Sequence, residues 1–204
     1  MSHHFFALIS RMWYINRWGL MRNTFQENIQ EHSHMVAVLA HALAVIRRDV
    51  FGGTADPGAA AVAALYHDAA EILTGDLPTP VKYYNPEIRD AYKQVEAVSA
   101  DKLAALLPEK LRGEYAPLLR EETDPEIHEL VKAADKLAAY IKCVEELKAG
   151  NGEFKQAARQ TRAVLEASPL PEVGYFMEQF LPGFGLTLDE LQEPHDHEEK
   201  ENKV

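Results

Sequence analysis

The chain has 204 residues, of which 47% are hydrophobic and 26% charged, so it is long enough for one domain with a hydrophobic core and too short to favour two. Asp and Glu outnumber Lys and Arg by 32 to 21, and the formal net charge of −11 excludes a general electrostatic surface for nucleic acids. No apolar run approaches the roughly 20 residues that cross a bilayer, and the N-terminus lacks the pattern of a signal peptide, so no membrane partner is expected.

The first half of the sequence predicts helices with short connections. A helix is expected over 28–48, where apolar residues recur at helical spacing before the Gly52-Gly53 pair. Asp56-Pro57 predicts the N-cap and first-turn proline of an alanine-rich helix that reaches about Leu73. Its small side chains suit close packing in the centre of a bundle. Two prolines and a glycine are expected to break the helix at TGDLPTP, residues 74–80.

The second half continues the helical pattern. Asp124-Pro125 repeats the cap signal and predicts a long helix that ends before Gly150. The other expected helices cover 86–107, 109–120, 153–167 and 172–181. The sequence contains neither a convincing alternating β pattern nor an internal repeat, so the predicted class is all-α, with a single domain over 1–192. The acidic segment 193–204 is expected to be a disordered tail.

Four polar residues have the chemistry of a metal site: His32 in the first core helix, His67 and Asp68 near the end of the alanine-rich helix, and Asp135 in the long helix. Asp135 borders the apolar stripe of its helix, where an unpaired carboxylate is costly to desolvate and a cation often compensates it. Two imidazoles and two carboxylates without a thiolate suit one divalent transition metal, such as Mn, Co, Zn, Ni or Fe. With nine histidines in the chain, a coincidental His-Asp pair remains the alternative at this point.

The order His, His-Asp, Asp across a helical chain resembles the HD-domain superfamily of metal-dependent phosphohydrolases. The local sequences resemble one branch, the bacterial 5′-deoxyribonucleotidases, over about residues 5–191. The segments that carry this resemblance are INRWGLMRN, ENIQEHS, YHDAAEILTGDLPTPVKYYN, VKAADKLAAYIKCVEELKAGN and YFMEQFLPGFGLTLDEL. The resemblance implies an HD-domain helical bundle that hydrolyses deoxyribonucleoside 5′-monophosphates to deoxyribonucleoside and phosphate by metal-activated water.

The resemblance also implies a role for each site residue. The metal ligands are His32, His67, Asp68 and Asp135. Arg17 is expected to orient the phosphate and Trp18 to shape the sugar pocket, while Glu71 or Asp76 manages protons, with base and acid left undecided. The expected nucleotide contacts are Arg17, Trp18, His32, Asp68, Asp76, Leu77, Pro78, Thr79 and Asp135. The implied cofactor is one divalent ion, cobalt, manganese or similar, and the implied assembly is a homodimer.

Two alternative functions stay open. One is another HD-type enzyme, such as a phosphodiesterase or a nucleoside triphosphate hydrolase, against which the scarcity of cations around the motifs argues. The other is a non-catalytic, metal-stabilised regulatory protein. His34 and His41, two turns apart, suggest either a second metal site or, more simply, surface residues, and Trp13 is expected in the core. The single cysteine, Cys143, fits a reducing cytoplasm, where we expect the protein to act.

Overall fold

The structure is a computed structural model that describes residues 2–82 and 84–192, so the predicted tail lies outside the described residues. Within them the chain is helical, and its β structure is an isolated bridge between Asn16 and Asn28. The predicted all-α class is therefore confirmed. The α-helices and 3-10 helices (η) are α1 Phe5–Ile9, η1 Ser10–Tyr14, α2 Ile29–Asp49, α3 Pro57–Tyr66, α4 Glu71–Thr74, α5 Thr79–Lys82, α6 Pro86–Ala105, α7 Glu109–Leu119, α8 Pro125–Lys148, η2 Gly152–Phe154, α9 Lys155–Glu166, α10 Pro171–Gln179, η3 Leu181–Gly185 and α11 Leu188–Gln192.

The helix starts follow from local capping. The Asn28 side chain accepts hydrogen bonds from the backbone N–H groups of Gln30 and Glu31, and the Glu31 carboxylate accepts the backbone N–H of Asn28, which completes a capping box at the start of α2. Asp56 and Asp124 cap α3 and α8 in the same way, each followed by a first-turn proline. Each such cap stabilises its helix by about 0.5–2 kcal/mol, and the sequence predicted those at Asp56 and Asp124.

The end of the alanine-rich helix is where the sequence-based prediction was wrong. Helix α3 ends at Tyr66 rather than Leu73, and residues 67–70 form a turn that leads into α4. The His67 imidazole binds the carbonyl of Ala64 and so occupies an acceptor of the last helical turn. The expected break at 74–80 is shorter, since α5 begins at Thr79 with Pro80 in its first turn, where a proline is tolerated.

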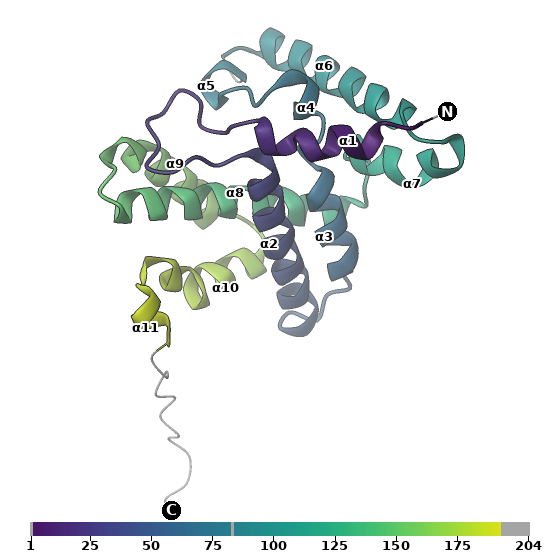
Figure 1. The fold of residues 1–204 in the computed structure, drawn as a ribbon. Coiled ribbons are helices and arrows are strands. Elements are labelled where there is room, and N and C mark those ends of the chain that lie inside the picture. The colour runs from purple at the N-terminus through teal and green to yellow at the C-terminus, as the bar shows by residue number, and fades with distance from the viewer. Residues whose placement is uncertain (1, 83, 193–204) are drawn as a thin grey trace, which may run out of the picture.

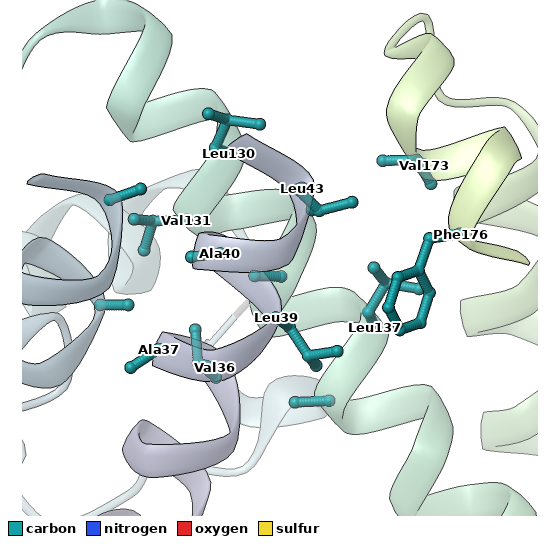
Figure 2. Close-up of a cluster of buried hydrophobic side chains, with 14 of the residues drawn as sticks. Val36, Ala37, Leu39, Ala40, Leu43, Leu130, Val131, Leu137, Val173 and Phe176 are labelled. Atoms are coloured by element: carbon teal, nitrogen blue, oxygen red, sulfur yellow. The ribbon is translucent and has the colours of Figure 1, made fainter. Parts of the chain in front are cut away.

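Helix α2 lies at the centre of the fold. It packs against α3, α8 and α10, and Figure 1 shows it crossing α8 steeply. Figure 2 shows the side chains that fill these contacts, with Leu39 and Leu43 of α2 directed toward Leu137 of α8 and Phe176 of α10. A second cluster joins α1, α6 and α7 around Phe5, Leu103, Leu107 and Leu119. Both clusters exclude Trp13, whose expected place in the core is wrong because 53% of it is exposed.

This packing determines where the polar residues meet. Because α2 contacts both α3 and α8, the first turn of α2, the turn after α3 and the middle of α8 converge. These positions carry His32, His67 with Asp68, and Asp135. Among the described helices, none is long and apolar enough to cross a membrane.

Candidate metal centre and active site

His32 lies at the centre of the polar cluster. It follows the capping box in the first turn of α2, and its side chain is fully buried. Its Nε2 atom is 3.1 Å from Asp135 Oδ1 and 3.6 Å from Asp68 Oδ2. One imidazole nitrogen therefore faces two carboxylates from two other elements.

His67 presents the second imidazole in the tautomer that a metal requires. Its Nδ1 lies 2.7 Å from the carbonyl oxygen of Ala64, and because a carbonyl only accepts, Nδ1 carries the hydrogen. In the neutral ring the lone pair is then on Nε2, which is buried, has no hydrogen-bond partner among the described residues, and lies 3.2 Å from Asp68 Oδ2. Two electron-rich atoms at this distance need a positive charge between them, and an imidazole fixed through its other nitrogen is the usual metal-binding arrangement.

The donor set fits one divalent ion. Single ligand atoms of His32, His67 and Asp135 lie within 4.8 Å of one another, and Asp68 Oδ2 adjoins both imidazoles. The structure thus brings the four predicted ligands together, and their mixed nitrogen and oxygen donors suit a transition metal. Within residues 2–82 and 84–192 it is the one group of His, Cys, Asp and Glu residues this close, and His34 and His41 are exposed outside it.

The ionisation of the cluster points to the same demand for positive charge. Burial raises the pKa of Asp68, but His67, His32 and Arg17 outweigh burial and hold it below its usual value. Burial also raises the pKa of Asp135. The hydrogen bond and charge of His32, together with the charge of Lys136, outweigh burial and lower this pKa below its usual value. Burial disfavours the charged form of His67, yet Asp68 more than offsets it and raises the pKa of His67. Both carboxylates are therefore charged at neutral pH.

Glu71 and Asp76 lie beside the cluster, and their pKa values are raised rather than lowered. Glu71 begins α4, is 6% exposed, and its Oε2 has no hydrogen-bond partner in the described part of the chain. Burial, then the charges of Asp68 and Asp76, raise the pKa of Glu71 to about 10, so its carboxyl is protonated at neutral pH. Asp76, half-buried in the loop after α4, has its pKa raised by burial and by Asp68 against the opposing charge of Arg17.

Arg17 and Trp18 lie in the segment between η1 and α2, and Arg17 contacts the cluster. The Arg17 Nη1 donates to Asp68 Oδ2 at 3.2 Å, and the charges of Asp68, Asp135 and Glu27 overcome burial to raise the pKa of Arg17. The Trp18 indole packs on Phe154 with ring centroids 5.3 Å apart. Arg17 thus contacts a predicted metal ligand directly, and Trp18 is its neighbour in the chain.

The remaining predicted nucleotide contacts lie farther along the same loop. Leu77 and Pro78 are half-buried between α4 and α5, and Thr79 is exposed. No hydrogen bond among the described residues joins these three to the metal cluster, so their contact with a nucleotide stays a prediction. The loop is held at its start, where the Tyr92 hydroxyl donates to the carbonyl of Gly75 at 3.0 Å.

Sequence reasoning missed Glu27 and the pair Lys142–Glu146. Glu27 Oε2 accepts the indole N–H of Trp18 at 2.9 Å, and Lys142 and Glu146 form a buried ion pair beneath the segment that carries Arg17. Spacing gives no signal for Glu27. Lys142 and Glu146 are spaced as an ordinary surface pair on a helix, so the sequence does not distinguish the buried case.

Comparison with known proteins identifies the family. Residues 4–184 match the family described as 5′-deoxynucleotidase YfbR-like. A 5′-deoxynucleotidase of Vibrio cholerae is 51% identical over 189 residues, covering 92% of this chain and 97% of the relative. The 5′-deoxynucleotidase YfbR of Escherichia coli is 52% identical over 191 residues, covering 93% and 96%.

Two solved structures share the fold. An HD-domain phosphohydrolase from Listeria innocua superposes with a TM-score of 0.78 at 24% identity, covering 89% of this chain and 88% of the other. The HD phosphohydrolase DatZ of cyanophage S-2L, bound to dA and one catalytic Zn²⁺ ion, superposes with a TM-score of 0.60 at 28% identity, covering 89% and 96%. With its all-helical fold, its His-Asp cluster and this similarity along nearly its whole length, the chain belongs to the YfbR-like family of HD-domain 5′-deoxynucleotidases.

Proposed function

We propose that this protein is a metal-dependent 5′-deoxynucleotidase, which hydrolyses deoxyribonucleoside 5′-monophosphates to deoxyribonucleoside and phosphate. The observation that carries the proposal is the convergence of two imidazoles, two charged carboxylates and Arg17 at one place. The chain is half identical to relatives named for this activity over more than nine tenths of its length. A related structure that holds dA beside a catalytic Zn²⁺ supports both the nucleotide and the metal.

We assign the divalent ion to His32, His67, Asp68 and Asp135. The unpartnered Nε2 of His67 and the charged state of both carboxylates support this assignment. When bound, such an ion lowers the pKa of a coordinated water and neutralises charge on a phosphoryl oxygen. The protein contributes a fixed arrangement of donors from α2, the turn after α3, and α8, so the ligands need little rearrangement.

Arg17 is suited to orient the phosphate. The Arg17 side chain is 13% exposed. Its guanidinium gives one hydrogen bond to Asp68, which leaves further N–H groups for an anion beside the cluster. A planar guanidinium binds phosphate through two parallel hydrogen bonds, and this fixes direction as well as charge. In a protein of net charge −11, such a local cation is necessary to hold an anionic substrate.

Glu71 and Asp76 are assigned the proton transfers. The protonated carboxyl of Glu71 supports a role as the acid that delivers a proton to the leaving 5′-oxygen. Asp76 is the candidate to accept the proton of the attacking water. Its raised pKa makes it a stronger base than an ordinary aspartate, and its half-buried side chain stays within reach of solvent. Trp18 is assigned to the sugar, and Asp76, Leu77, Pro78 and Thr79 to further contacts with the nucleotide.

The finer properties of the protein are also proposals. We propose cobalt or manganese as the activating ion, a homodimer as the assembly, and the cytoplasm as the location. The donor set supports a transition metal of this kind, and the buried, unpaired thiol of Cys143 is compatible with a reducing compartment. Light scattering after size-exclusion chromatography tests the homodimer, and a monomer mass at micromolar concentration would contradict it.

The first experiment measures phosphate release by metal-stripped protein from 2′-deoxyadenosine and adenosine 5′-monophosphates. Co, Mn, Zn and Mg are added separately, and the protein without metal is the control. We expect release that depends on the metal and favours the deoxyribonucleotide. Release from cyclic nucleotides or triphosphates in its place, or no release with any metal, would contradict the proposed function.

A further inference from the structure

The backbone of Trp18 has an unusual conformation. Its φ angle is 58°, and in the described chain only Glu121 shares a positive φ among residues other than glycine. For a bulky side chain this left-handed region is strained, so the surrounding contacts must stabilise it. Such a residue next to a proposed substrate site therefore raises the question of what holds it there.

Several contacts hold Trp18, among them a hydrogen bond at 3.4 Å from the Asn23 side-chain amide to its carbonyl. Its carbonyl accepts the backbone N–H of Met21 at 2.9 Å, its ring packs on Phe154, and its indole N–H donates to Glu27 Oε2 at 2.9 Å. The hydrogen bonds to the carbonyl restrict the backbone, and the contact with Phe154 restricts one face of the ring. The hydrogen bond to Glu27 is the contact that fixes how the indole is rotated.

Glu27 binds the neighbouring residue as well. Its carbonyl accepts the backbone N–H of Arg17 at 2.8 Å, and its Oε2 lies 3.3 Å from Arg17 Nε. The latter contact is an ion pair, because its geometry falls short of a hydrogen bond. The Glu27 side chain is 15% exposed, so solvent screens these contacts little. A single carboxylate oxygen therefore faces both the indole and the guanidinium.

The segment that carries these residues is fixed to α8. The Lys142 ammonium donates to the carbonyl of Phe25 at 2.8 Å, and the Glu146 carboxylate accepts the backbone N–H of Thr24 at 2.9 and 3.1 Å. Asn151 donates to the carbonyl of Arg22 at 2.7 Å. Since α8 also carries Asp135, the same helix sets the metal cluster and the position of the segment around Trp18.

We propose that Glu27 is a positioning residue for deoxyribose selection, which acts by fixing the Trp18 indole relative to the metal cluster. The inference rests on the proposed function and names the group that makes it selective. A wall of the sugar pocket rejects one extra hydroxyl only when the wall does not move, since a pocket that yields discriminates weakly. Glu27 supplies that rigidity through the indole N–H, while its contact with Arg17 affects both kinds of nucleotide equally.

The test compares kcat/KM for 2′-deoxyadenosine and adenosine 5′-monophosphates in metal-loaded enzyme. Glu27→Gln keeps the shape but replaces the charged acceptor with a neutral amide, which weakens the hydrogen bond from the indole, and Trp18→Phe keeps an aromatic ring but removes the indole N–H. We expect each variant to lower the deoxy-to-ribo ratio by about tenfold. The double variant is expected to lower it no further than Trp18→Phe alone, because both changes act on the same interaction. The control, Glu153→Gln on the exposed surface, is expected to leave the ratio unchanged.

A second measurement follows the indole itself without metal or substrate. In a Trp13→Phe background Trp18 is the remaining tryptophan, and we expect Glu27→Gln to shift its fluorescence emission and to increase its quenching by acrylamide. If Glu27→Gln fails to fold, the deoxy-to-ribo ratio of kcat/KM in Trp18→Phe decides whether the indole hydrogen bond matters for selection.

The outcomes separate the two proposals. A selective wild-type enzyme whose ratio is unchanged in Glu27→Gln and Trp18→Phe would overturn the positioning role. A wild-type protein that hydrolyses neither nucleotide would overturn the proposed function. In that case unchanged fluorescence in Glu27→Gln would also overturn the placement of the indole by Glu27.

Discussion

Two buried polar clusters lie on the same helix, α8, and differ in how completely they are paired. Around Glu146, each charge has partners: Lys142 at 2.5 Å, the Thr24 backbone and the Asn151 amide. About three turns earlier, around Asp135, buried atoms of His67 and Glu71 lack partners among the described residues. A fully paired buried cluster stabilises the fold, whereas an incompletely paired one is where a ligand is expected.

The pKa values of two buried glutamates express the difference. Burial alone raises the pKa of any carboxyl, and at Glu71 nearby Asp68 and Asp76 add to it, giving about 10. At Glu146 burial is outweighed by hydrogen bonds from Lys142, Asn151 and Thr24, which lower the pKa to about 2. At neutral pH Glu71 is therefore protonated, whereas Glu146 is charged. Four experiments test this contrast, from the largest expected effect to the smallest.

Asp68→Ala is expected to abolish metal binding and activity together, because Asp68 adjoins both imidazoles and Arg17. The loss of kcat/KM is expected to be at least about 10⁴-fold, while the helical circular dichroism is kept. Metal content by plasma mass spectrometry and phosphate release are measured on the same sample. Asp189→Ala on the exposed surface is the control, and full activity in Asp68→Ala would disprove the site.

Glu71→Gln separates chemistry from stability. Glutamine resembles the protonated glutamate in shape and neutrality, so the free energy of unfolding is expected to change by less than about 0.5 kcal/mol. The kcat value is expected to fall by about 10²–10⁴-fold, the range for a lost acid or base group. Both are measured with metal-loaded protein. An unchanged kcat would remove Glu71 from the proton transfer.

Glu146→Gln is expected to show the reverse pattern. Removing the carboxylate leaves the ammonium of Lys142, 2% exposed, without its counter-ion and lowers the free energy of unfolding by about 3–5 kcal/mol. Urea unfolding of the metal-free protein measures this loss. The matched control is Glu145→Gln at the exposed neighbouring position. Equal stability of the two variants would show that the cluster around Glu146 does not hold the fold.

The pH dependence of stability tests the same pair with a smaller signal. A carboxyl whose folded pKa is lowered stabilises the fold above its unfolded pKa of about 4.3, and the contribution is lost as pH falls toward the folded pKa. For Glu146 the window runs from the unfolded value down to about 2. The difference in unfolding free energy between wild type and Glu146→Gln is therefore expected to shrink below pH 4.5. A difference that stays constant with pH would contradict the assigned charge.

Helix starts and the candidate ligands were predictable, because they depend on local chemistry. Asn28, Asp56 and Asp124 each present a side-chain acceptor to the first helical turn, and all three helices begin there. The His-Asp pattern predicted four residues that the structure places together. Their roles as ligands stay predictions until a metal is seen.

The remaining features depend on contacts between distant parts of the chain. No glycine or proline marks the end of α3, so the turn at His67 was not visible in the sequence. The strained backbone of Trp18 is held in part by Phe154, which lies far along the chain from it. Helical spacing alone placed neither Lys142 nor Glu146 inside the protein.

The most direct test of the account is an anomalous difference map from crystals grown with Mn²⁺ or Zn²⁺ at an ion concentration that supports phosphate release. We expect one strong peak about 2.0–2.3 Å from the Nε2 atoms of His32 and His67 and from carboxylate oxygens of Asp68 and Asp135. A peak at other residues, or no peak in protein that hydrolyses the deoxyribonucleotide with that ion, would contradict the claim that the incompletely paired cluster is the metal centre.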